Sequence, residues 1–230
     1  MKTRILICLA VLVLALGAFT AYKLINRANR ARYTVDDRLE QIGAQVAERL
    51  GGELGAGKLP EKVRLIALKQ ERQLELHVRF AAEDPWQHVK TYPIVAASGR
   101  AGPKLKEGDR QVPEGEYGIE SLNPNSHFYL ALKVAYPSEE DVEMARRDGR
   151  RTDNLGSFIM IHGKGGSIGC IAIANADIEE IFWLAARVKV QNIELLIAPF
   201  DFRTLPITVP PGTPSWTEER YHRLKARMLE

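Results

Sequence analysis

A histidine and a cysteine lie close together in a glycine-rich stretch of this 230-residue chain, between Ile161 and Cys170. A thiol becomes a nucleophile when a nearby base removes its proton, and imidazole is a common base. An apolar strand that ends at His162 and a loop that returns at Cys170 can bring the two side chains together. We therefore predict that Cys170 is a nucleophile and that His162 is its proton acceptor and donor.

The loop between these two residues supplies further candidates. Its glycines let the backbone turn sharply and expose its amides, so the amides near Gly169 and Cys170 are candidate donors to an oxyanion. Ser167 and Gly163 are the other residues that we expect to support the loop.

Cysteine usage favours catalysis over structure. The chain has two cysteines, and Cys8 lies in the N-terminal apolar segment, so Cys170 has no partner in the rest of the chain. Structural cysteines of exported proteins usually pair, and exposed single thiols oxidise. An unpaired thiol beside a histidine is therefore best explained by a reaction.

Other interpretations of the loop are weaker. Lys164 precedes the glycines instead of following them, so the loop is not a Walker loop, and Ile168 breaks the dinucleotide fingerprint. A zinc site needs at least three protein ligands, so His77 or His127 would have to join by folding. We predict neither a metal nor a cofactor. A purely structural histidine–cysteine pair remains a further alternative.

The N-terminus is apolar from Ile5 to Tyr22. A helix rises ~1.5 Å per residue, so this run nearly spans a ~30 Å hydrocarbon layer, and cleavable signal peptides usually have shorter runs. We expect residues 1–26 to be an uncleaved signal anchor in the inner membrane, with a cleaved signal peptide as the alternative. Either one places the rest of the chain in the periplasm. The net charge of +3 is too small to imply nucleic acid as a partner.

The remaining chain divides into three parts. Residues 27–60 are predicted to form a juxtamembrane helix and linker, because apolar residues recur at helical spacing from Val35 to Leu50. Residues 61–203 are predicted to form a catalytic domain, and 204–230 a proline-rich linker with a final helix over 217–229. The expected strands cover 63–69, 73–79, 86–97, 117–122, 128–134, 157–161 and 192–198. The expected internal helices cover 139–147 and 175–189, the second with Asn175 as its N-cap.

The pattern His162-Gly163, followed by Ser167-x-Gly169-Cys170, resembles the signature of the L,D-transpeptidase catalytic domain (YkuD-type). The resemblance covers roughly residues 63–200 and is greatest to the YafK-like branch. It rests there on Gly102-Pro103-Lys104, Gly108-Asp109 and Pro113-Glu114-Gly115. It implies a mainly β fold with flanking helices, a curved β-sandwich with the cysteine on a loop between strand and helix.

The resemblance also implies a reaction on peptidoglycan stem peptides. Cys170 would attack the carbonyl of the third stem residue, and the terminal D-alanine would leave. An amine, which an envelope protein can supply, would resolve the thioester in a transpeptidase. Water would resolve it in a hydrolase that cleaves crosslinks or links between proteins and peptidoglycan.

Two positions depart from the family pattern. Ile168 stands where many members have a histidine, and Ala172 where many have an arginine. Lys164, Arg150 and Arg151 are candidates for the role of that arginine in binding substrate. An exported cysteine peptidase is disfavoured, because papain-like enzymes place the cysteine before the histidine. A non-catalytic wall-binding module would be expected to lose Cys170 or His162.

Overall fold

The structure is a computed structural model that describes residues 17, 19–20, 32–55 and 58–230. Residues Thr34–Glu230 form one compact unit, to which the following description is confined. The expected membrane anchor at 1–26 lies outside the described residues, apart from Gly17, Phe19 and Thr20. Within the described parts of the chain, no helix combines the length and the apolar character needed to cross a bilayer.

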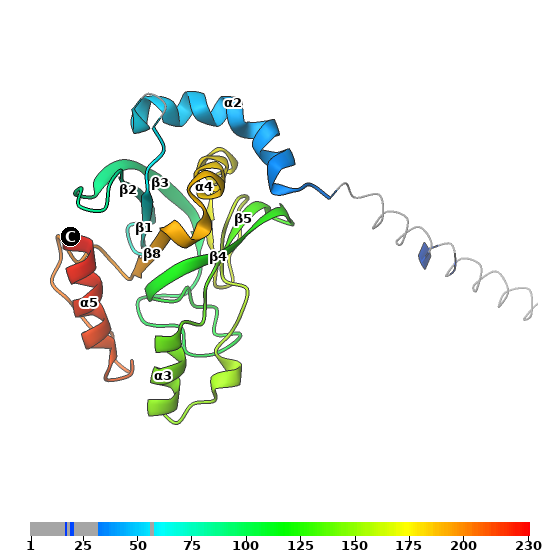
Figure 1. Cartoon of the computed structure of the whole chain (residues 1–230). Helices are drawn as coiled ribbons and strands as arrows, with labels where there is room; N and C mark the ends of the chain where they lie inside the picture. Colours follow the sequence, from blue (N-terminus) through cyan, green and yellow to red (C-terminus); the bar gives the residue numbers. More distant parts are fainter. Residues whose placement is uncertain (1–16, 18, 21–31, 56–57) are drawn as a thin grey trace, which may run out of the picture. The chain divides into compact units, whose positions relative to one another are not determined.

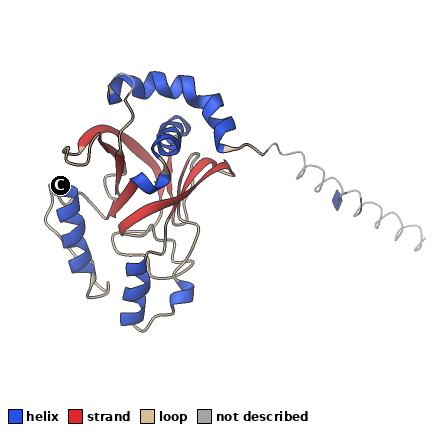
Figure 2. Cartoon of the chain, viewed as in Figure 1, coloured by secondary structure: helices blue, strands red, loops and turns tan. Residues whose placement is uncertain are grey.

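The unit has a mixed α/β fold around a barrel of eight strands (Figures 1 and 2). The strands are β1 (Lys62–Leu68), β2 (Gln73–Arg79), β3 (Gln87–Ala97), β4 (Gly115–Ser126), β5 (Tyr129–Val134), β6 (Met160–His162), β7 (Ile171–Ile173) and β8 (Ile193–Ala198). Their closed order is β1-β2-β3-β7-β6-β5-β4-β8. The predicted β-rich domain is present, but its strands close into a barrel where a curved sandwich was expected.

Two long strands explain the closure. β3 pairs with β2 along its first part and with β7 near its end, and β4 pairs with β8 and then with β5. The register of β3 against β7 shifts between Ile94 and Ala96, and that of β4 against β5 shifts between Ile119 and Ser121. Bulges bend a strand, so β3 and β4 can each belong to both halves of the barrel.

The strands β1 and β8 are parallel neighbours that are buried on both faces. In β1, Leu65 and Ala67 belong to the main core, whereas Ile66 and Leu68 pack in a second apolar cluster with α5 (Thr217–Leu229). A continuous apolar run is typical of a strand covered on both sides. The C-terminal helix is therefore part of the folded unit.

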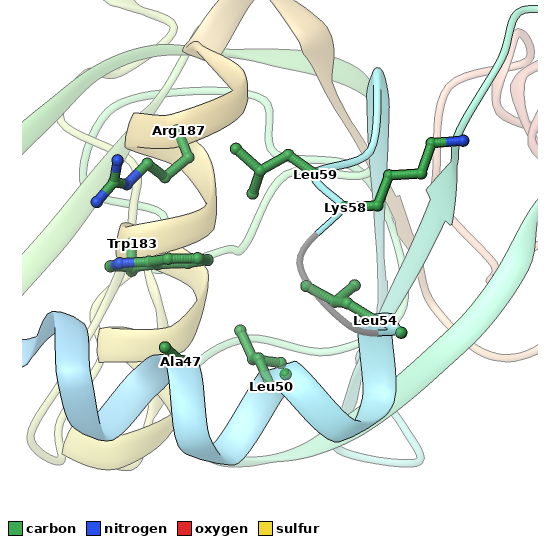
Figure 3. A pocket seen from close by; sticks show the side chains of 9 residues that line it. Ala47, Leu50, Leu54, Lys58, Leu59, Trp183 and Arg187 are labelled. Carbon is green, nitrogen blue, oxygen red and sulfur yellow. The ribbon is translucent and has the colours of Figure 1, made fainter.

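The helix α2 (Val35–Leu54) packs across α4 (Asn175–Val188), as Figure 1 shows. It begins with a capping box between Thr34 and Asp37, and it buries Ile42, Val46 and Leu50 in the main core. The compact unit thus starts at Thr34, and not near residue 61 as the sequence suggested. Near its end, α2 and Trp183 of α4 border an apolar pocket of about 340 Å³ (Figure 3).

The helix α3 (Glu139–Arg147) has the bounds expected from the sequence, and its N-cap Ser138 forms a capping box with Asp141. Asp141 also accepts a hydrogen bond of 2.9 Å from Nη1 of Arg220 in α5. Two elements that the sequence placed in separate domains are therefore joined by a buried ion pair.

Candidate active site

The strands β6 and β7 bring the predicted catalytic residues together. They are parallel neighbours in which Ile161 pairs with Ile171 and His162 with Ala172. Cys170 directly precedes β7, so the same register places it opposite Met160. Side chains two residues apart share one face of a strand, and adjacent strands lie ~4.8 Å apart. Cys170, in the bend directly before β7, thus lies beside β6, and it lines the same cleft as His162.

The geometry of His162 suits a base that acts through Nε2. The side chain is buried, and Nδ1 lies 2.7 Å from the Gly163 carbonyl oxygen. A carbonyl can only accept, so Nδ1 carries the proton and Nε2 keeps its lone pair. The Phe128 ring packs against the imidazole, with the centroids 4.5 Å apart. Burial lowers the pKa of His162, although its hydrogen bond to Gly163 acts in the opposite direction. The imidazole is accordingly neutral at pH 7.

The thiol of Cys170 is partly buried and is also neutral at rest. Its Sγ lies 3.6 Å from the Phe158 carbonyl oxygen, the acceptor of a weak S–H hydrogen bond. Burial raises the pKa of Cys170, while the Met160 backbone amide and the positive charge of Lys104 lower it. A neutral thiol beside a neutral imidazole can ionise only as the proton moves to the base.

Ser167 holds the loop in front of the thiol. Its hydroxyl donates to the Cys170 carbonyl at 2.6 Å and accepts from the Ser98 amide at 3.1 Å. The same oxygen accepts from the Gly169 amide at 3.2 Å. Because the Gly169 amide already has a partner, the Cys170 amide is the better of the two predicted oxyanion donors.

Gly163 is required by a close approach. A Cβ at this position would lie 2.7 Å from Oδ1 of Asn175 and 3.0 Å from Cγ2 of Ile178. Asn175 was expected to cap α4, but the N-cap is Ala174, which makes no side-chain cap bond. The Asn175 side chain instead accepts from the Lys164 amide at 2.9 Å. It thereby fixes the start of the catalytic loop against α4.

A cleft of about 810 Å³ opens in front of these residues. Cys170, His162 and Gly169 line it, together with polar and charged side chains from other loops. Three of its apolar side chains are exposed, namely Phe128, Phe158 and Ile168. The cleft can thus contact both polar and aliphatic parts of a ligand.

The cations predicted to bind substrate lie elsewhere. The described residues that line the cleft include neither Lys164, Arg150 nor Arg151. Arg150 pairs with Asp148 and donates to the Leu105 carbonyl at 2.9 Å. Arg151 pairs with Asp153 in solvent. A role for these three cations in binding substrate stays a prediction.

Sequence reasoning missed two cations that do line the cleft, Lys104 and Arg110. Both belong to the loop between β3 and β4, far from Cys170 in sequence. Arg110 has a φ of 57°, which is uncommon for a residue with a side chain. The only sequence signal was that Lys104 and Asp109 are among the residues shared with the YafK-like branch.

Comparisons with known proteins identify a family for this chain. Residues 69–199 match the model of the YkuD family, the L,D-transpeptidase catalytic domain. YafK of Escherichia coli (strain K12), which carries a provisional name as an L,D-transpeptidase, is 35% identical over 137 residues. That alignment covers 57% of this chain and 52% of YafK, so the chain spans about half the length of this relative.

Solved structures are more distant. The helical cell shape determining protein Pgp2 from Campylobacter jejuni is 19% identical, with 67% of this chain and 55% of Pgp2 covered and a TM-score of 0.48. Bd1075 of Bdellovibrio bacteriovorus is 22% identical, with 74% and 56% covered and a TM-score of 0.44. The family model covers more than half of the sequence and includes both His162 and Cys170. The chain belongs to the L,D-transpeptidase catalytic domain (YkuD) family.

Proposed function

We propose that this protein is a cysteine acyltransferase that acts on peptidoglycan stem peptides as an L,D-transpeptidase. The observation that carries the proposal is that His162, at the end of β6, and Cys170, directly before the neighbouring parallel strand β7, line one cleft. Membership of the family supports peptidoglycan as the substrate and the cell envelope as the location. We also propose that residues 1–26 attach the domain to the inner membrane or direct its export.

The first half of the reaction forms a thioester. Nε2 of His162 takes the thiol proton while Sγ of Cys170 attacks the carbonyl of the third stem residue. The Cys170 amide stabilises the oxyanion of the tetrahedral intermediate, and loss of such a donor commonly costs about 3 kcal/mol. The intermediate then collapses, the bond to the terminal D-alanine breaks, and the departing amine receives the proton from His162.

The second half transfers the acyl group. An amine of a second stem peptide or of an envelope protein gives its proton to His162 and attacks the thioester. The new amide forms, the sulfur leaves, and Cys170 regains its proton. Hydrolysis is the second candidate outcome, because the exposed side chains of Phe158 and Ile168 leave this side of the cleft open to water.

Mass spectrometry of muropeptides tests the proposal. The purified protein is incubated with tetrapeptide muropeptides, with and without an amine acceptor such as a free D-amino acid. Transpeptidation yields the exchanged product only with the amine, whereas hydrolysis yields the tripeptide in both samples. Cys170→Ala is the control and should be inactive. Equal turnover by this variant and the original protein would refute the assignment of the nucleophile.

A further inference from the structure

Lys104 is a buried cation in the wall of the catalytic cleft. Its side chain is 4% exposed, and Nζ donates to Oδ1 of Asp109 at 2.6 Å and to the Lys106 carbonyl at 2.9 Å. An ammonium has three protons, so these partners account for two of them. A lysine is seldom buried this deeply, and its charge must therefore be compensated by its surroundings.

The loop before β6 makes room for this side chain. A Cβ at Gly156 would lie 2.6 Å from Cε of Lys104 and 3.2 Å from its Nζ. Gly156 also has a φ of 112°, which disfavours any other residue. The same loop continues through Phe158, whose carbonyl faces the Cys170 thiol. Lys104 is thus packed against the segment that contacts the nucleophile.

The position of the ammonium is fixed by its own loop. Asp109 accepts from the backbone amides of Leu105, Lys106 and Gln111 at 2.8, 3.1 and 3.0 Å. A carboxylate held by three amides keeps its place without the lysine. These contacts hold Nζ near the cleft and leave little freedom for it to follow a ligand.

We propose that Lys104 is a positioning residue that stabilises the Cys170 thiolate, formed when the thiol proton passes to His162. Many family members have an arginine at the position of Ala172, and this chain lacks that positive charge. Lys104 would supply a positive charge from the β3–β4 loop instead. Ala172 is buried within the β6–β7 ladder, opposite His162. The inference rests on the proposed role of Cys170 as nucleophile.

Other charged or titratable groups line the same cleft. They are Glu107 and Arg110 of the same loop, His127 between β4 and β5, and His162 of β6. The first three are exposed, so water and salt screen their effect on the thiol. Lys104 is buried, and its field reaches the sulfur through a less polarisable medium. The positive charge of Lys104 accordingly lowers the pKa of Cys170.

The test is the pH dependence of thiol alkylation in the full-length protein. Iodoacetamide is the probe, and peptide mass spectrometry separates Cys170 from Cys8. We expect Lys104→Met to move the alkylation midpoint upward by about 1 pH unit, the effect of losing one nearby opposite charge. Below that midpoint the alkylation rate should fall roughly 10-fold, because the thiolate fraction falls by that factor.

Two further variants separate charge from packing. Lys104→Arg keeps the charge and should restore most of the original profile. Lys106→Met removes one exposed charge from the same loop and should leave the midpoint unchanged. If Lys104→Met fails to fold, Lys104→Gln replaces it, since the amide can still donate to Asp109. An unchanged midpoint in a folded Lys104→Met or Lys104→Gln protein would overturn the proposal.

The measurement is independent of turnover. Alkylation needs no peptidoglycan, so an upward shift would support the role of Lys104 even if the stem-peptide assay were negative. A positive stem-peptide assay with no shift would instead refute the role of Lys104 and leave the proposed function intact.

Discussion

Glu114, on the side of the barrel covered by α3 and α5, and His162, in the catalytic cleft, are both buried but differ in their number of hydrogen-bond partners. At α5, the carboxylate of Glu114 accepts from Lys69, Gly102 and Tyr221 at 2.8, 2.9 and 2.6 Å. In the cleft, the buried imidazole of His162 has one hydrogen bond within the described part of the chain, to its own neighbour Gly163. Paired charges stabilise a fold, whereas a side chain with an unused lone pair can accept a proton. The paired charges at α5 therefore serve stability, whereas the unused lone pair of His162 in the cleft serves reactivity.

Among the predicted variants, replacement of His162 should have the largest effect, and that effect should be on the acylation rate. We expect His162→Ala to lower the rate of acylation by a factor on the order of 10²–10⁴, because the base is lost. Its thermal stability should change far less than its rate. Stopped-time assays on tetrapeptide muropeptides measure the first quantity, and circular dichroism measures the second. A folded variant that retains most of its activity would show that another group takes the proton.

Replacing Arg220 should affect the other region. The guanidinium is almost fully buried and contacts Asp141, Glu140 and the Glu114 carbonyl. Arg220→Met leaves the Asp141 carboxylate buried without its counter-ion, so we expect a loss of about 3–5 kcal/mol in the free energy of unfolding.

The matched control for Arg220 is one turn further along the same helix. Arg223 is 44% exposed and pairs with Glu219 and Glu140. Arg223→Met should cost at most about 1 kcal/mol. Urea unfolding of both variants decides the point. Equal losses in the two would mean that burial of the ion pair does not determine its contribution.

Acid should affect the stability of the barrel and the activity of the cleft through different groups. Burial of Glu75 would raise its pKa, but hydrogen bonds from His77 and Arg203 outweigh burial and lower the pKa to about 2. The unfolded value is near 4.5, so this carboxylate contributes about 2–3 kcal/mol above pH 4.5. That contribution is lost as the pH falls from 4.5 towards 2. Glu75→Gln should remove this part of the acid destabilisation, and Glu120→Gln, at an exposed pair, should not.

The acid limit of activity has a different origin. His162 must be neutral to accept a proton, and burial lowers its pKa below the ordinary value of 6.5. The acid limb of kcat/KM should therefore lie below pH 6.5, and Glu75→Gln should not move it. Rate profiles of the two proteins measure this limb. If the acid limb of Glu75→Gln lay at a different pH from that of the original protein, the charge of Glu75 would influence the cleft.

The smallest effect is expected at Arg151. Its side chain and that of Asp153 are 79% and 68% exposed, and neither lines the cleft. Arg151→Ala should leave KM, kcat and the melting temperature unchanged. An increased KM for tetrapeptide substrates would restore Arg151 as a substrate-binding residue and place the substrate beyond the cleft described above.

Local sequence signals determined most of the helices and strands. Apolar alternation and turn residues located β1, β2, β3 and β8, and the bounds of α3 and α5 were predicted to the residue. The strand expected at 157–161 is β6, Met160–His162, and the short β7 was missed. β6 and β7 are only three residues long, so their pairing depends on neighbouring strands more than on any periodic pattern.

By itself, the sequence determined that Cys170 and His162 are the candidate reactive pair, because that prediction follows from side-chain type and the glycines between them. Tertiary structure alone decided which charges surround the pair. Lys104 is distant in sequence and reaches the cleft because the β3–β4 loop folds over Gly156, whereas Lys164 is close in sequence but lies outside the cleft. Electrostatic influence depends on distance and burial, and neither quantity is encoded in local spacing.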